Sequence, residues 1–196
     1  DNMFGISDAY FCSNFWYRRT FVIPQEMRGQ RVLLNFDGIN WKADVWLNGK
    51  KIDRIEGAFT RSTVDITPYI NNGVNTMAVL IHKNAHPGSI KEKNHLNTDF
   101  NGGILGADNP TFHATTGWDW ISTIRGRDIG IWNDVYLTST ASVTLSEPVV
   151  STHLDNLPDT LACITPRVIA HNWLNKDVSG TLKGWIGNLK FEKKLT

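Results

Sequence analysis

Residues 43–52 read Ala-Asp-Val-Trp-Leu-Asn-Gly-Lys-Lys-Ile, and this stretch decides the fold. Residues 43–47 have the character of a strand. Asn48-Gly49 follows, and this pair favours a two-residue type I′ turn because both central residues of that turn need positive φ. The stretch therefore predicts a hairpin with strands at 43–47 and 50–52.

Further segments with strand character lie on both sides of this hairpin. They cover residues 15–23, 31–36, 62–66, 75–81 and 129–138. Pro, Gly and Asn separate them, and we find no convincing helical pattern, internal repeat or low-complexity tract. Strands of this kind can bury their apolar sides only by packing two sheets face to face. We therefore expect an all-β sandwich over residues 10 to 140.

The length of the chain limits the number of domains, and its charge indicates which kinds of partner to expect. The chain has 196 residues, enough for one full domain and part of another, and a formal net charge of +1. Because the charge is nearly neutral and Lys and Arg are scattered, we expect neither nucleic acid nor a membrane surface as the partner. No apolar run approaches membrane-spanning length, and the chain starts without a signal peptide, as a mature form or an excised part would.

A domain boundary is predicted near residues 141–148, which divides the chain into 1–142 and 143–196. Short strands follow at 147–155, 160–171 and 178–186, with a turn at Asn156-Leu157-Pro158-Asp159. This spacing is typical of an immunoglobulin-like sandwich, which needs about 100 residues. The second domain is therefore expected to be incomplete.

Residues 83–129 lack regular periodicity. A loop of that length in a compact domain is usually functional or disordered, and the aromatic content here argues against disorder. Within it, 117–132 reads GWDWISTIRGRDIGIW, in which Trp118 and Trp120 flank Asp119. An indole can cover the C–H face of a pyranose and a carboxylate can accept from its hydroxyls, so these three are the candidate substrate-binding residues. The alternative is that both tryptophans are buried in the core and Asp119 only caps a turn.

Five segments in order carry a resemblance to the sugar-binding domain of glycoside hydrolase family 2. They are 15–21 (FWYRRTF), 35–50 (NFDGIN, then ADVWLNGK), 65–70 (DITPYI), 73–79 (GVNTMAV) and 130–135 (GIWNDV). The family includes β-galactosidases, β-glucuronidases, β-mannosidases and exo-β-glucosaminidases. The Gly117-Trp118-Asp119-Trp120 element resembles the mannosidase and exo-glucosaminidase branches.

The resemblance implies a galactose-binding-like jelly roll, then an immunoglobulin-like domain, then a (β/α)8 barrel that is absent from this sequence. In that family the barrel holds both catalytic carboxylates, and terminal β-glycosidic bonds are hydrolysed with retention. The implied role of Trp118, Asp119 and Trp120 is to contact a terminal sugar at the barrel mouth. The implied partners are a carbohydrate and the missing barrel of the same polypeptide, with self-association through the incomplete domain. The alternative is a stand-alone carbohydrate-binding or structural module.

We assign no catalytic residue, metal ligand or cofactor to the chain itself. Glycoside hydrolysis needs a pocket that raises the pKa of one carboxyl group and leaves a second one ionised, and the sequence indicates no such pocket. The aspartates of this region are Asp99, Asp108, Asp119, Asp128 and Asp134. Four histidines are scattered with no predicted helix and no nearby cysteine to form a metal site: His82, His86, His95 and His113. They are interpreted as loop histidines.

Several structural expectations complete the interpretation. Arg18 and Arg19 point to opposite faces of a strand and cannot share a ligand, so one of them is expected to pair with Asp37 or Asp44. Trp16, Trp41 and Trp46 are expected in the core. Cys12 and Cys163 are expected to be free thiols, with a disulfide between them as the alternative. The chain has no Asn-x-Ser/Thr acceptor, which favours a bacterial source, and we expect a periplasmic or secreted location.

Overall fold

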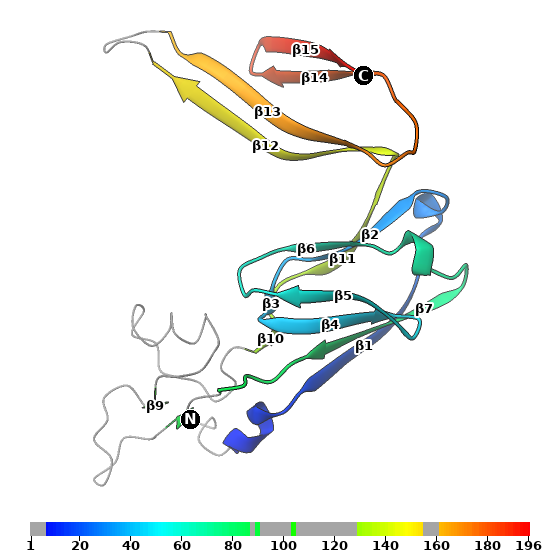
Figure 1. Ribbon diagram of the computed structural model, residues 1–196, viewed down its shortest axis with the longest axis vertical. Coiled ribbons are helices and arrows are strands. Elements are labelled where there is room, and N and C mark those ends of the chain that lie inside the picture. The colour runs from blue at the N-terminus through cyan, green and yellow to red at the C-terminus, as the bar shows by residue number, and fades with distance from the viewer. Residues whose placement is uncertain (1–6, 87–88, 91–102, 105–128, 155–160) are drawn as a thin grey trace. The chain divides into compact units, whose positions relative to one another are not determined.

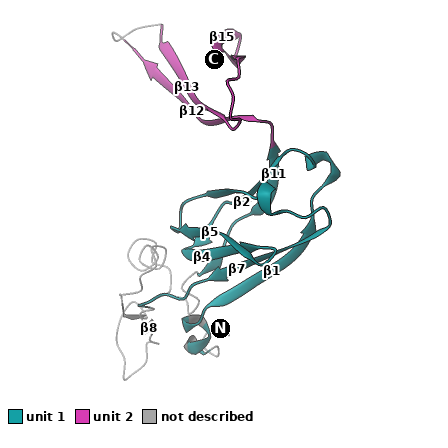
Figure 2. Ribbon diagram, turned by 45° about the vertical axis from the view of Figure 1, so that its right-hand side comes forward, with its two compact units in different colours: residues 1–139 teal, residues 140–196 magenta. Residues whose placement is uncertain are grey.

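A computed structural model describes residues 7–86, 89–90, 103–104, 129–154 and 161–196. The chain forms two compact units, residues 1–139 and 140–196, shown in different colours in Figure 2. Within the described residues the regular structure is strand and short 3-10 turns, with no α-helix and no helix long and apolar enough to cross a membrane. The expected all-β class is therefore confirmed.

The described part of the first unit contains two main sheets and two small two-stranded ones (Figure 1). One sheet has the order β1-β7-β4-β5, the second has the order β11-β2-β6, and β10 pairs with β3. The strands are β1 (Phe15–Val22), β2 (Arg31–Phe36), β3 (Ile39–Asn40), β4 (Lys42–Leu47), β5 (Lys50–Glu56), β6 (Ser62–Asp65), β7 (Val74–Ile81), β10 (Gly130–Ile131) and β11 (Val135–Thr140). Short 3-10 turns lie at Asp8–Cys12, Gln25–Met27 and Thr67–Tyr69, and β8 (Ser89–Ile90) pairs with β9 (Gly103–Ile104).

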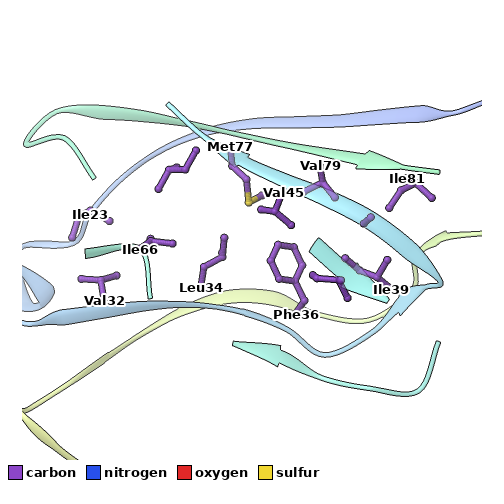
Figure 3. Packing of buried hydrophobic residues seen from close by; sticks show 13 residues of the cluster. Ile23, Val32, Leu34, Phe36, Ile39, Val45, Ile66, Met77, Val79 and Ile81 are labelled. Atoms are coloured by element: carbon purple, nitrogen blue, oxygen red, sulfur yellow. The ribbon is translucent and has the colours of Figure 1, made fainter. Parts of the chain in front are cut away.

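The core lies between these sheets because each contributes one alternating face. The β2 residues Val32, Leu34 and Phe36 are buried at every second position, as period 2 requires. They face side chains of the opposite sheet, among them Val45 of β4 and Val79 of β7 (Figure 3). The expected packing of two sheets face to face is confirmed.

The predicted hairpin joins β4 to β5 through Asn48-Gly49. Asn48 has φ 51° and Gly49 has φ 82°, the positive values that a type I′ turn needs. The Asn48 side chain also anchors this turn, since its Nδ2 donates to the Tyr69 carbonyl at 2.8 Å and its Oδ1 accepts from Thr76 N at 2.9 Å. Asn75, which is fully buried, accepts a further bond from Asn48 Nδ2 at 2.8 Å. A sequence-local turn is thus tied to β7.

The second unit consists of two hairpins that are each antiparallel. Strand β12 (Val143–His153) pairs with β13 (Cys163–Asn172), and β14 (Gly180–Ile186) pairs with β15 (Leu189–Leu195). Across the described part of 140–196 no residue is fully buried. The apolar side chains of these hairpins, such as Trp185 with 75% of its surface exposed, have no second layer to pack on within those residues. Cys163 of this unit and Cys12 of the first are unpaired cysteines.

Candidate functional site

The long irregular segment leaves and re-enters the sandwich at one place. Strand β7 ends with Ile81 paired to Ala43, and His82 N donates to the Lys42 carbonyl at 2.9 Å. Strand β10 begins with Gly130 paired to Asn40. Both ends of the segment are therefore held beside the short stretch 40–43. This end of the sandwich also carries the start of β1, because Phe15 pairs with Ile81.

The sequence-predicted site residues belong to this segment. Trp118, Asp119 and Trp120 lie outside the described residues, as do His95 and His113. Strand β10 starts ten residues after Trp120, so the chain that carries the candidate site is attached directly to the sandwich at Gly130. The role of these three residues therefore stays a prediction.

Asp44 lies at the same end, on the outer face of the β1-β7-β4-β5 sheet. Its side chain is only 11% exposed and lies between two basic groups. Lys51 Nζ lies 2.7 Å from Oδ1, and His82 Nε2 lies 3.1 Å from Oδ2. Burial by itself raises the pKa of Asp44, but hydrogen bonds and charge from Lys51 and then His82 outweigh it, so the net pKa is lowered. The carboxylate is therefore held ionised, and it fixes the residue at which the long segment begins.

Two tryptophans lie over the same face. The Trp16 and Trp46 rings have centroids 5.0 Å apart and are tilted by 50°. The expectation that Trp16, Trp41 and Trp46 are core residues is wrong: Trp16 is 60% exposed, and the other two are half-buried outside the core cluster. The physical reason is the period of the strand. Trp16 and Trp46 alternate with inward residues such as Val45, so they face away from the second sheet.

The expected pairing of Arg18 or Arg19 with a sandwich aspartate is also wrong. Asp44 is paired as described above, and Asp37 lies 3.4 Å from Arg61 Nε. Tyr136 Oη donates to Asp37 at 3.4 Å as well. Both arginines belong to β1, which lies at the edge of its sheet and has seven exposed residues out of eight. Arg61 and Lys51, in contrast, belong to segments beside the two carboxylates.

We find no candidate metal site among the residues that the structure describes. His82 contacts Asp44, and His86 is exposed. In the part of the chain that the structure describes, no three His, Cys, Asp or Glu residues gather closely enough to hold a metal ion.

Comparison with known families decides the identity of this domain. The family model described as "Glycosyl hydrolase 2 galactose-binding domain-like" matches residues 7–133. The chain belongs to glycoside hydrolase family 2. The resemblance seen in the sequence is thus confirmed, and the sandwich of this family 2 chain is the N-terminal galactose-binding-like domain of such enzymes.

The similar proteins described below are family 2 glycosidases. The chain is 36% identical to a mannosylglycoprotein endo-β-mannosidase of Lilium longiflorum over 148 residues, which cover 73% of the chain and 15% of the relative. It is 28% identical to an exo-β-D-glucosaminidase of Streptomyces avermitilis, with 99% of the chain and 19% of the relative covered. Among solved structures, an exo-chitosanase of Amycolatopsis orientalis matches with TM-score 0.72 and 26% identity, covering 99% of the chain and 20% of that protein. The chain thus spans about a fifth or less of these relatives.

The Asp44 cluster is the part of the site that sequence reasoning missed. The alternation over 43–47 does place Asp44 and Trp46 on one face. The residues that lie beside them are set by the strand register. Asp44 on β4 and Trp16 on β1 are both paired with Leu80 of β7, which lies between them. Since β1 and β7 are far from β4 in sequence, no local signal identifies these neighbours.

Proposed function

We propose that this chain is the N-terminal part of a longer family 2 β-glycosidase that hydrolyses terminal β-glycosidic bonds with retention. The family assignment and the small share of each relative that the chain spans carry this proposal. A C-terminal barrel would supply the acid/base and the nucleophile, two carboxylates about 5–5.5 Å apart. The present chain would support that barrel and contribute one loop to it.

The contributed loop is the segment that bears Trp118, Asp119 and Trp120. Its two ends are attached side by side at 40–43, which supports a loop projecting from one end of the sandwich. There Asp119 would accept hydrogen bonds from sugar hydroxyls, and the two indoles would wall the site. A hydrogen bond to a charged group contributes roughly 1.5–3 kcal/mol.

The first test uses the full-length enzyme with an aryl β-glycoside. Asp119→Ala should reduce kcat/KM by about ten- to a hundredfold while the fold survives, because one charge-assisted bond to substrate is lost. Asp134→Ala is the matched control, since Asp134 is exposed on the chain just before β11. Unchanged kinetics of the Asp119 variant would remove the proposed substrate contact.

The second test asks where the catalytic groups lie. The isolated 196-residue chain should not turn over aryl β-glycosides above background, because the proposed carboxylates belong to the barrel. Turnover by the isolated chain that is lost with Asp119→Ala would overturn the proposal that the catalytic groups belong to the barrel. A reading frame that encodes no barrel would favour the second candidate function, a stand-alone carbohydrate-binding module.

The exposed apolar side chains of 140–196 support a further part of the proposal. We propose that later strands of the longer polypeptide complete an immunoglobulin-like sandwich over them, and that a second copy of the chain covers them when those strands are missing. Light scattering of the isolated chain should then show self-association. We also propose a periplasmic or secreted bacterial enzyme, which cell fractionation tests.

A further inference from the structure

The outer face of the β1-β7-β4-β5 sheet presents an aromatic surface whose geometry follows from the register. Trp16 on β1 and Trp46 on β4 are separated by β7, yet their rings meet at 5.0 Å. Between them β7 contributes Ala78, which is paired with Arg18 on one side and with Trp46 on the other. Because a methyl group is small, the two indoles can lean together above β7. We call Trp16, Trp46 and Arg18 the indole platform.

Most charged side chains around the indole platform contact a group of opposite charge, and Lys42 and Arg54 share Glu56. Asp44 is neutralised by Lys51 and His82, and Lys42 Nζ lies 3.0 Å from Glu56. Arg18 is exposed and has no ion pair among the described residues. It is two residues from Trp16 on the same face of β1. Among the described residues, a guanidinium without an ion pair therefore borders the exposed Trp16 indole.

We propose that the indole platform binds a pyranose that bears a carboxylate, a uronic acid residue of a β-linked saccharide. The apolar C–H face of the ring stacks on Trp16, which is 60% exposed. The carboxylate accepts from Arg18, whose planar fork matches it in two parallel hydrogen bonds. The residues that carry this proposal belong to β1 and β4, whereas the proposed substrate loop carries Trp118 to Trp120.

Lys51 gives the platform a second polar contact. Its ammonium lies 5.7 Å from the centre of the Trp46 ring and 2.7 Å from Asp44 Oδ1. An ammonium has three donors, and Asp44 occupies one, so the others can reach ring hydroxyls. Asp44 in turn is held by His82. The aromatic surface is thus bordered by fixed polar groups, which suits a saccharide better than the broad apolar core of a protein interface.

The test compares two sugars that differ only at C6. Methyl β-D-glucuronide and methyl β-D-glucoside are titrated into the 196-residue chain at constant ionic strength, and binding is followed from the indole N–H signals in NMR spectra. We expect a dissociation constant of about 1–10 mM for the glucuronide, since a single ring gives few contacts. The glucoside should bind about tenfold more weakly, because it lacks the charge-assisted bonds.

Variants separate the two contributions. Trp16→Ala should weaken both sugars at least about tenfold, since the stacking surface is lost. Arg18→Gln should remove the preference for the glucuronide and leave the glucoside affinity within about twofold. Arg19→Gln is the matched control for the guanidinium, because the adjacent residue points to the other face of β1. Trp185→Ala, an exposed indole of β14, is the control for Trp16.

Three outcomes would overturn the proposal. One is no saturable binding of the glucuronide up to about 50 mM, which would favour a polypeptide segment as the cover of this face. Another is binding that persists in the Trp16 variant, which would place the sugar elsewhere. The third is equal affinity for both sugars in the unmodified chain, which would remove the carboxylate from the ligand. If the Trp16 variant fails to fold, the Arg18 and Arg19 variants still decide the question.

Discussion

At the scale of single residues, Asp44 shows how a charge is stabilised on the outside of a sheet. Burial of a carboxylate whose side chain is 11% exposed costs free energy, because the charge loses contact with water, but Lys51 and His82 both contact it here. The net effect is a lowered pKa. A carboxyl whose pKa is lower in the folded chain than in the unfolded one, where it is about 3.9, stabilises the fold above that pH. This contribution is lost as the pH falls through the folded-state pKa.

The corresponding prediction is a pH-dependent loss of stability. Asp44→Asn should lower the free energy of unfolding by about 1–3 kcal/mol at pH 7, since hydrogen bonds to a charged group are lost. The difference from the unmodified chain should shrink as the pH drops below about 3.9, because the unfolded chain then binds a proton at Asp44 while the folded chain still holds that carboxyl ionised. Urea unfolding at pH 7 and pH 3 measures both values. Glu56→Gln, in an exposed pair with Lys42, should cost less than about 1 kcal/mol. An Asp44→Asn penalty that is the same at both pH values would contradict this account.

At the scale of elements, Trp132 connects the chain just after β10 to two other segments. Its Nε1 donates to the Ala58 carbonyl at 3.1 Å, and its backbone N donates to the Gly38 carbonyl at 3.2 Å. A side chain at Gly38 would overlap the Trp132 indole. Only glycine leaves room for this ring, so the place where the long segment re-enters the sandwich depends on a residue more than 90 positions earlier.

Gly38→Ala should therefore displace the Trp132 ring and break its bond to Ala58. The expected cost is about 1 kcal/mol, because the hydrogen bond to Ala58 is lost while the half-exposed ring can move aside. The indole N–H signal of Trp132 in NMR spectra and a thermal melt report the two effects. Gly73→Ala is the matched control, because a methyl group there meets nothing within 4 Å. That variant should stay within about 0.5 kcal/mol of the unmodified chain. A Trp132 signal unchanged by Gly38→Ala would contradict the proposed packing.

At the scale of the whole molecule, the two units differ in how much they bury. The first unit has a core between two sheets, whereas the described part of the second has hairpins without a fully buried residue. Isolated two-stranded hairpins are marginally stable in water. Amide hydrogens of β14 and β15 should therefore exchange at least about a hundredfold faster than those of β2 and β4. Hydrogen-exchange NMR or mass spectrometry of the isolated chain measures this. Equal protection in both units would contradict it and would point to a covered second unit.

Most of the fold could be predicted from the chain itself because its signals are local. Alternating side chains, the Asn48-Gly49 turn and Pro24 marked strands whose bounds agree with the structure to within a few residues, as β2 at Arg31–Phe36 illustrates. The order of five family-like segments identifies the domain from the sequence alone. Only side-chain chemistry predicts Trp118 to Trp120 as substrate contacts, because no local pattern indicates where that loop lies.

The strands, the turns and the family can be predicted from the chain because each depends on neighbours along it. Which residues share a face across strands depends on how the sheets pack. Trp16 meets Trp46 and Asp44 meets His82 because β7 inserts between β1 and β4 in one particular register. A shift of that register by one residue would turn every outer side chain inward, and only burial of the apolar face selects the observed pairing. That selection is a property of the packed sandwich, which is why Trp16 was expected in the core and lies on the surface.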